Sequence, residues 1–194
     1  MARLERARYV TFMCGRATLT VSPDEIREIF ALDELPKDLP PRFNIAPTQP
    51  LPIIRTPGRL ELLPWGTKER RVINVRLERA STKPGSRCLV VLDGFYEWRD
   101  SDKQPFYFHR ADGKPFALGG VVLGEGAAIV TTDPLPGIIE LHDRMPLVLA
   151  KQDWSKWLEG DKPKPTLNGF ESYPVSTFVN SPKNDAKECV QPIT

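Results

Sequence analysis

The chain contains few of the residues that usually build metal sites or disulfide frameworks. Its 194 residues include three cysteines and two histidines. The cysteines are odd in number and none has the C-x-x-C spacing of a zinc site, so with His109 and His142 they do not form a convincing metal centre. A reducing cytoplasm is the simplest setting for such a chain. We therefore expect a cytoplasmic protein without a metal ion or another cofactor.

Long apolar runs and a strong net charge are also missing. No apolar run approaches the roughly 18 to 20 residues of a membrane span, and the first residues lack the apolar core of a signal peptide. The formal net charge of +2 is too small to indicate polyanion binding by the whole surface. A nucleic-acid site would need a local group of arginines. We expect a protein that is neither secreted nor membrane-bound.

Turn residues and short apolar runs predict an α+β fold. Ser22, Pro23 and Glu25 form a helix-start pattern that predicts a helix over residues 23–31, and further short helices are expected near 135–141 and at 152–158. Strands are expected at 51–55, 59–63, 88–92, 97–98, 105–109, 116–123 and 127–132. The prolines around 42–49 predict an ordered, extended loop. The pattern indicates a mainly antiparallel, curled or barrel-like sheet with a few short peripheral helices.

Cys14 is the most informative residue, because it follows Met13 near the start of the chain. If Cys14 becomes the first residue, its amine and thiol can react with an aldehyde, first as a Schiff base and then as a five-membered thiazolidine. The alternative is a small buried residue in a first strand. Residues 1–12 differ from the remainder, and three explanations are open. They are an over-extended start, a segment removed to free Cys14, or a retained basic arm.

Two further residues offer acid or base chemistry. Glu97 lies among aromatics in DGFYEW at 93–98, where burial would raise the carboxyl pKa and allow proton donation near neutral pH. A surface glutamate is the alternative. His142, in HDRMP at 142–146, can act as an acid or base near pH 7. His109 lies in a run of bulky residues, and we expect it to pack.

An amide and several arginines are candidates for contact with a nucleic-acid backbone. Asn74 and Arg76 would point to the same side of an extended segment. Arginine binds phosphate bidentately and tryptophan stacks on bases, which makes candidates of Arg16, Arg76, Arg87, Arg144 and Trp65. A solvated, charged surface is the alternative.

Taken in order, these segments resemble the SRAP family, the SOS response-associated peptidases or abasic site processing proteins. The resemblance rests on MCGR at 13–16, RFNIAPTQ at 42–49, Trp65-Gly66, INVR at 73–76, DGFYEW at 93–98 and HDRMP at 142–146. It implies a single SRAP domain over residues 13–194, with Cys14 as the mature N-terminus and residues 1–12 dispensable or removed. In the family the cysteine usually stands at position 2, and this chain departs from that pattern.

The resemblance implies a protein that senses abasic sites in single-stranded DNA and shields them by a thiazolidine crosslink through Cys14. We expect a monomer, because one lesion needs one reactive terminus and the sequence shows no obvious self-association segment. It also implies self-cleavage ahead of Cys14, lyase-type Schiff-base chemistry, and a role in the SOS response to DNA damage, at the nucleoid if the source is bacterial. Family positions assign catalysis to Cys14, Asn74, Glu97 and His142. They assign DNA contact to Arg16, Asn44, Trp65, Arg76, Arg87 and Arg144.

Two other functions remain open at this point. An N-terminal-nucleophile cysteine hydrolase would use Cys14, with its own amine or His142 as the base, to cut a peptide or amide. A non-catalytic module for single-stranded DNA would use the arginines and tryptophans. That second alternative leaves Cys14, Glu97 and His142 unexplained.

Overall fold

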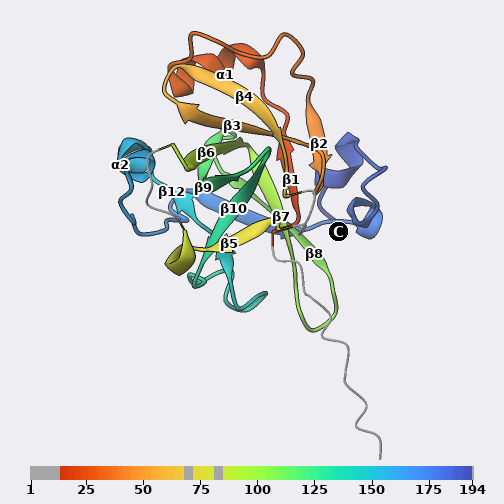
Figure 1. Ribbon diagram of the computed structural model, residues 1–194. Coiled ribbons are helices and arrows are strands. Elements are labelled where there is room, and N and C mark those ends of the chain that lie inside the picture. Colours follow the sequence, from red (N-terminus) through yellow and green to blue (C-terminus); the bar gives the residue numbers. More distant parts are fainter. Residues whose placement is uncertain (1–13, 68–71, 81–84, 194) are drawn as a thin grey trace, which may run out of the picture.

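Two β-sheets with short helices at their edges make up the computed structural model (Figure 1). It describes residues 14–67, 72–80 and 85–193, so the expectations for residues 1–12 fall outside the described residues. The smaller sheet has the strand order β13-β8-β7-β1-β2. The larger sheet follows β11-β10-β9-β6-β3-β4, with β12 paired to β9 and β5 paired to β10.

The strands are short, and all pairs are antiparallel except that of β5 with β10. The smaller sheet contains β1 (Arg16–Leu19), β2 (Arg42–Ile45), β7 (Gly94–Trp98), β8 (Pro105–Arg110) and β13 (Phe170–Pro174). The larger sheet contains β3 (Pro50–Thr56), β4 (Arg59–Pro64), β5 (Asn74–Arg76), β6 (Arg87–Leu92), β9 (Phe116–Leu123), β10 (Gly126–Thr132), β11 (Met145–Pro146) and β12 (Val148–Leu149). This confirms the mainly antiparallel α+β class. Among the described residues the sheets stay open and do not close into a barrel.

The helices are few and peripheral, as expected. They are α1 (Pro23–Phe30), α2 (Trp154–Glu159), and the 3-10 turns η1 (Leu77–Arg79), η2 (Lys151–Asp153), η3 (Thr177–Asn180) and η4 (Lys187–Val190). In α1 the Ser22 side chain accepts the backbone N–H of Glu25 at 3.2 Å, which is the predicted start. No helix within the described ranges is long and apolar enough to cross a membrane.

Two local predictions were wrong. The expected helix over residues 135–141 is a series of turns. Pro134 and Pro136 lack a backbone N–H, and Gly137 has a φ of 94°, which no right-handed helix contains. The expected loop over 42–49 begins as strand β2, because its first residues pair with β1. An extended, proline-flanked segment is compatible with an edge strand.

Asp93 ties β1 to the start of β7. Its carboxylate accepts hydrogen bonds from the hydroxyl of Thr18, from both the N–H and the hydroxyl of Thr20, and from the N–H of Val21. Asp93 is only 6% exposed, and removing its carboxylate would take the acceptor from the Thr20 and Val21 N–H groups, whereas the Thr18 hydroxyl would keep its 3.0 Å contact with Tyr107. Since Cys14 lies directly ahead of β1, Asp93 also helps to place the start of the described chain.

Replacing Asp93 by alanine is expected to lower the free energy of unfolding by about 3 kcal/mol, because several donors lose their acceptor at once. Urea unfolding followed by circular dichroism measures this change. Asp38→Ala, which removes an exposed carboxylate, should stay within about 0.5 kcal/mol of the parent. A similar small change for Asp93→Ala would show that the network does not hold β1.

Candidate active site

Cys14 and Glu97 meet where β1 begins and β7 ends. β1 runs antiparallel to β7 with Arg16 opposite Tyr96, so residue 14 lies beside the end of β7. The backbone nitrogen of Cys14 donates to Oε1 of Glu97 at 3.0 Å. Both residues are buried, with exposures of 0% and 1%. The nitrogen that would become the α-amine of a chain beginning at Cys14 therefore already contacts a carboxyl group.

Burial controls the protonation of this pair. Burial raises the pKa of Glu97 to about 8, with the Cys14 N–H opposing the shift and the charge of Asp100 adding to it. This confirms the predicted rise of the Glu97 pKa. Burial, with a further contribution from Glu97, also raises the pKa of the Cys14 thiol well above its ordinary value. At neutral pH the pair therefore favours a protonated carboxyl group and a neutral thiol.

His142 lies in the segment that follows the turns at 135–141. The N–H of Asp100 donates to the carbonyl of Leu141 at 3.0 Å, which holds this segment beside the end of β7. His142 is only 6% exposed. Asp100 stands only three residues after Glu97 in the chain. Its bond to Leu141 therefore places the segment that contains His142 at the same end of the smaller sheet as the Cys14–Glu97 pair.

The ring of His142 has two alternative partners for Nδ1. The N–H of Arg144 donates to Nδ1 at 3.2 Å, and Oδ1 of Asp143 lies 2.9 Å from the same atom. The first contact needs an unprotonated Nδ1, and the second needs a protonated one. The neutral ring that accepts from Arg144 carries its proton on Nε2. That atom is buried and has no hydrogen-bond partner among the described residues, so it can donate to a bound group.

β10 brings Asn74, Arg76 and Arg144 to one end of the larger sheet. In the parallel pair β5–β10, Asn74 lies opposite Ile129 and Arg76 opposite Thr131. The guanidinium of Arg144 donates to the carbonyl of the same Thr131 at 2.9 Å. Arg76 is exposed, whereas Asn74 is partly buried. The segments of Arg76 and Arg144 thus lie on either side of Thr131.

The guanidinium of Arg144 is already held by acidic partners. It is 7% exposed and donates to Asp133 at 2.6 Å and to Glu78 at 3.4 Å. Arg76 carries its charge on the surface instead. Among the arginines expected to contact phosphate, Arg76 is therefore the better candidate, and Arg144 has a structural role in fixing the segment that contains His142.

Trp65 and Arg87 were expected to contact DNA, and the structure buries both side chains. Trp65 is fully buried, and its indole N–H donates to the carbonyl of Ile73 at 3.0 Å. Arg87 is 1% exposed, with its guanidinium 4.0 Å from the centre of the Trp157 ring and bonded to the carbonyl of Asp161. Each side chain makes polar contacts inside the protein, and its contact with DNA stays a prediction.

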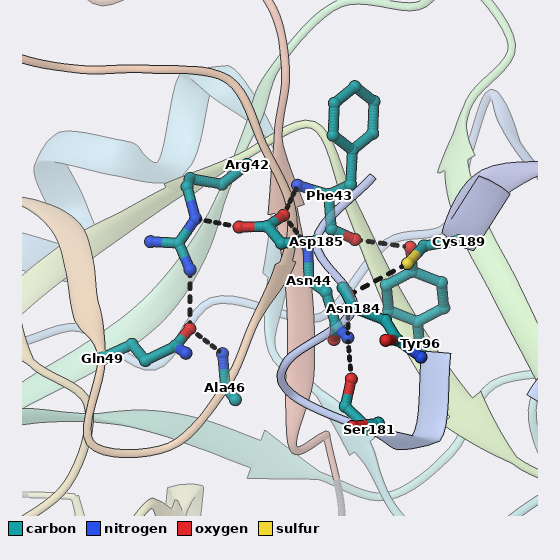
Figure 2. A network of polar contacts seen from close by, with 10 residues as sticks. All are labelled: Arg42, Phe43, Asn44, Ala46, Gln49, Tyr96, Ser181, Asn184, Asp185 and Cys189. Atoms are coloured by element: carbon teal, nitrogen blue, oxygen red, sulfur yellow. Dashed lines mark hydrogen bonds and ion pairs between the residues drawn. The ribbon is translucent and has the colours of Figure 1, made fainter. Parts of the chain in front are cut away.

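Asn44 was also expected to contact DNA, and Figure 2 shows its surroundings. The side-chain amide of this fully buried residue donates to the carbonyls of Val179, Ser181 and Asn184. The carboxylate of Asp185 accepts the backbone N–H groups of Phe43 and Asn44 at 2.6 and 3.0 Å (Figure 2). Asn44 therefore joins the C-terminal segment to β2, and its contact with DNA stays a prediction.

Asn180 was not singled out by the sequence as a site residue, yet it borders the site. Its carbonyl accepts Nη2 of Arg16 at 3.0 Å, and its side-chain oxygen accepts the indole N–H of Trp98 at 2.8 Å. Arg16 and Trp98 follow Cys14 and Glu97 closely in the chain. Asn180 thus fixes the outer part of the site.

A family model described as SOS response associated peptidase (SRAP) matches residues 13–182, a range that includes Cys14, Glu97 and His142. The chain belongs to the SRAP family. This confirms the resemblance seen in the motifs. Within the described residues of this SRAP protein, no group of three histidine, cysteine or acidic side chains is arranged to hold a metal ion.

Two curated SRAP relatives match over almost their whole length. Abasic site processing protein YoqW of Bacillus subtilis is 32% identical over 222 residues, covering 92% of this chain and 99% of the relative. Abasic site processing protein YedK of Escherichia coli is also 32% identical over 222 residues, covering 93% and 100%. Both relatives carry the same functional description in their names.

Solved structures support the same architecture. A phage-related protein from Bordetella bronchiseptica is 30% identical with a TM-score of 0.66, covering 84% of this chain and 94% of that protein. A protein from Bacteroides thetaiotaomicron has a TM-score of 0.75 at 19% identity, covering 93% and 100%. The second similarity shows the fold alone.

Proposed function

We propose that this SRAP protein recognises abasic sites in single-stranded DNA and attaches to them covalently through an N-terminal Cys14. The observation that carries the proposal is the buried 3.0 Å contact between the Cys14 nitrogen and the Glu97 carboxyl group. Two relatives that match over almost their full length are named abasic site processing proteins, which supports the substrate class.

The reaction begins at the amine of Cys14. In a chain whose first residue is Cys14, this amine attacks the open-chain aldehyde of the abasic sugar and forms a carbon–nitrogen bond. The adduct loses water to give a Schiff base, and Glu97, beside the same nitrogen, supplies the proton that the leaving water needs. The thiol then adds to the imine carbon while its proton passes to nitrogen. The product is a five-membered thiazolidine.

The neutral thiol supports this order of steps and disfavours the hydrolase alternative. A cysteine hydrolase attacks with a thiolate, which is usually stabilised by a neighbouring histidine. Burial raises the Cys14 pKa, and Nε2 of His142 has no hydrogen-bond partner in the described parts of the chain. The amine, in contrast, has its acid–base partner in place. We therefore favour amine attack followed by thiol addition.

We assign the remaining family roles by position. His142 would donate from Nε2 to an oxygen of the sugar, and Asn74 would orient the Cys14 end. Residues 13–194 would form a single domain. Self-cleavage ahead of Cys14 would give that residue its free amine. Cys14 has a φ of 34°, a left-handed conformation that costs a non-glycine residue about 1–2 kcal/mol. That strain adjoins the peptide bond that would be cut.

A single-stranded oligonucleotide with one abasic site tests the proposal. The protein is prepared with Cys14 as its first residue, which intact-mass measurement verifies. We expect a DNA–protein species that survives heat and detergent. A hydrolase would cut an amide without durable attachment, and a passive binder would release DNA in detergent. Failure of the Cys14-first protein to attach would contradict the proposal.

Exposed Arg76 is expected to contribute a phosphate contact, unlike buried Arg87. Arg76→Ala should weaken binding to the abasic oligonucleotide, and the slope of log affinity against log salt should fall by about 0.7, the value for one phosphate of a single strand. Fluorescence anisotropy at several salt concentrations measures this in a Cys14→Ala background. Arg55→Ala, which removes a cation paired with Glu61, is the control. Equal slopes in both variants would exclude the Arg76 contact.

A further inference from the structure

A hollow of about 480 Å³ lies away from the Cys14–Glu97 pair. Along β8, Phe106 lies opposite Glu97, and Arg110 stands four residues further on, about 13 Å away in an extended strand. Figure 1 shows α2 and β12, which border the hollow, on the side of the molecule away from β2. The lining residues that matter here are Arg110, Lys114, Phe116, Lys151, Trp154 and Phe170.

Trp154, one of the lining residues, carries a buried hydrogen-bond donor. Nε1 of Trp154 is buried and has no hydrogen-bond partner among the described residues. The ring itself is fixed, since it stacks on Phe30 with centroids 4.4 Å apart and an interplanar angle of 5°. An unsatisfied buried donor costs about 1–3 kcal/mol. A bound acceptor oxygen would remove that cost.

Cationic side chains also line the hollow. Nζ of Lys151 lies 5.8 Å from the Trp154 ring centre. Arg110 is paired with Asp112 at 2.6 Å, so these two charges offset each other. Lys114 and Lys151 are exposed and form no ion pair in the described part of the chain. The acceptor that best fits this side of the hollow is therefore anionic.

Aromatic side chains form another part of the wall. Phe116 and Phe170 pack edge to face with centroids 4.8 Å apart, and Phe170 remains partly exposed. Aromatic faces bind nucleobases by stacking, and lysines bind phosphate. The volume lies within the range of about 300–1,000 Å³ typical of small-ligand sites. Cations, a buried N–H and an aromatic surface thus occur together.

We propose that this hollow binds a nucleotide. A phosphate oxygen would accept the Trp154 N–H and face Lys114 and Lys151, with the base against Phe170. A free nucleotide and a nucleotide within a strand share this chemistry. The site uses neither Cys14 nor Glu97, so it goes beyond the proposed attachment to abasic DNA.

Titration of the full ¹⁵N-labelled protein with deoxyadenosine monophosphate tests the inference. The indole signal of Trp154, assigned with Trp154→Phe, reports binding in NMR spectra. We expect a saturable shift, and binding about tenfold weaker in Lys151→Ala, in Trp154→Phe, and for deoxyadenosine or inorganic phosphate alone. For Trp154→Phe, affinity is measured by calorimetry. Lys156→Ala is the matched control, because this α2 lysine pairs with Asp153 at 3.0 Å and does not line the hollow.

The absence of a saturable shift, equal binding of inorganic phosphate, or an equal loss in Lys156→Ala would overturn the inference. A short oligodeoxyadenylate identifies the source. A shift with both ligands supports a strand, and a shift with the monophosphate alone supports a free nucleotide. Attachment to abasic DNA is scored separately on a denaturing gel. The two proposals can therefore fail independently.

Discussion

Cys14→Ala is expected to abolish heat-stable attachment to an abasic oligonucleotide while leaving a species that borohydride can trap. The comparison uses proteins that begin at residue 14. Alanine keeps the α-amine, whose nitrogen lies 3.0 Å from Glu97, and so can still form a Schiff base. It lacks the thiol that closes the thiazolidine ring. Denaturing gels, run with and without borohydride before heating, measure both species.

The other two cysteines provide the control. Cys88 and Cys189 are also buried and free, so Cys189→Ala removes a thiol without touching the proposed nucleophile. This variant should attach to DNA as the parent does. A heat-stable species of normal yield from Cys14→Ala would show that the thiol takes no part, and the thiazolidine mechanism would have to be abandoned.

Glu97→Gln is expected to have two opposite effects. Attachment should slow by about 10²–10⁴-fold, because glutamine cannot donate or accept the proton needed at the Cys14 nitrogen. Stability at alkaline pH should rise, because glutamine stays neutral in a site where an ionised carboxylate is poorly solvated. Single-turnover attachment rates and thermal unfolding between pH 5 and 9 measure the two effects.

The pH dependence follows from the raised pKa of Glu97. The folded protein holds this proton up to a pH of about 8, whereas the unfolded chain releases it near the ordinary value of 4.5. Folding therefore takes up a proton between these values, and the contribution of Glu97 to stability falls as pH rises through this window. Glutamine does not titrate, so the Glu97→Gln variant lacks this loss of stability. Its free energy of unfolding should therefore increase relative to that of the parent from pH 5 to pH 8.

This prediction applies to the chain that retains residues before Cys14. A free ammonium group at the Cys14 nitrogen would favour the ionised carboxylate and lower the Glu97 pKa. In a protein that begins at Cys14, the pH range between the unfolded and folded pKa values of Glu97 should therefore be narrower. Glu171→Gln, at an exposed position, serves as a control for the loss of one carboxylate. Identical pH profiles for Glu97→Gln and the parent would contradict the assignment.

Local sequence signals predicted those parts of the fold that depend on near neighbours. Ser22 and Glu25 contact each other across one helical turn, so their spacing was sufficient. A raised Glu97 pKa was predicted from the aromatic residues of DGFYEW, and burial is its main cause. The distant Cys14 N–H, which opposes the shift, had no signal in that segment.

The burial of three predicted site residues depends on distant partners. Arg87 was a candidate because arginine binds phosphate, but Trp157, 70 residues later, provides a ring and a carbonyl for its guanidinium. The sequence around Trp65 does not indicate whether its side chain faces the core or the surface. Its burial beside Ile73 results from tertiary packing. Asn44 was assigned to DNA contact by family position alone, and the three acceptors of its amide come from the far end of the chain.

The bond between Arg16 and the carbonyl of Asn180 spans 164 positions of sequence. During synthesis, β1 leaves the ribosome long before its C-terminal support exists. A nascent chain can form the early hairpins, but it cannot anchor Arg16 and Trp98 until Asn180 has emerged. We therefore expect the outer part of the site to assemble only near the end of translation, which would delay competence to bind DNA until the chain is nearly complete.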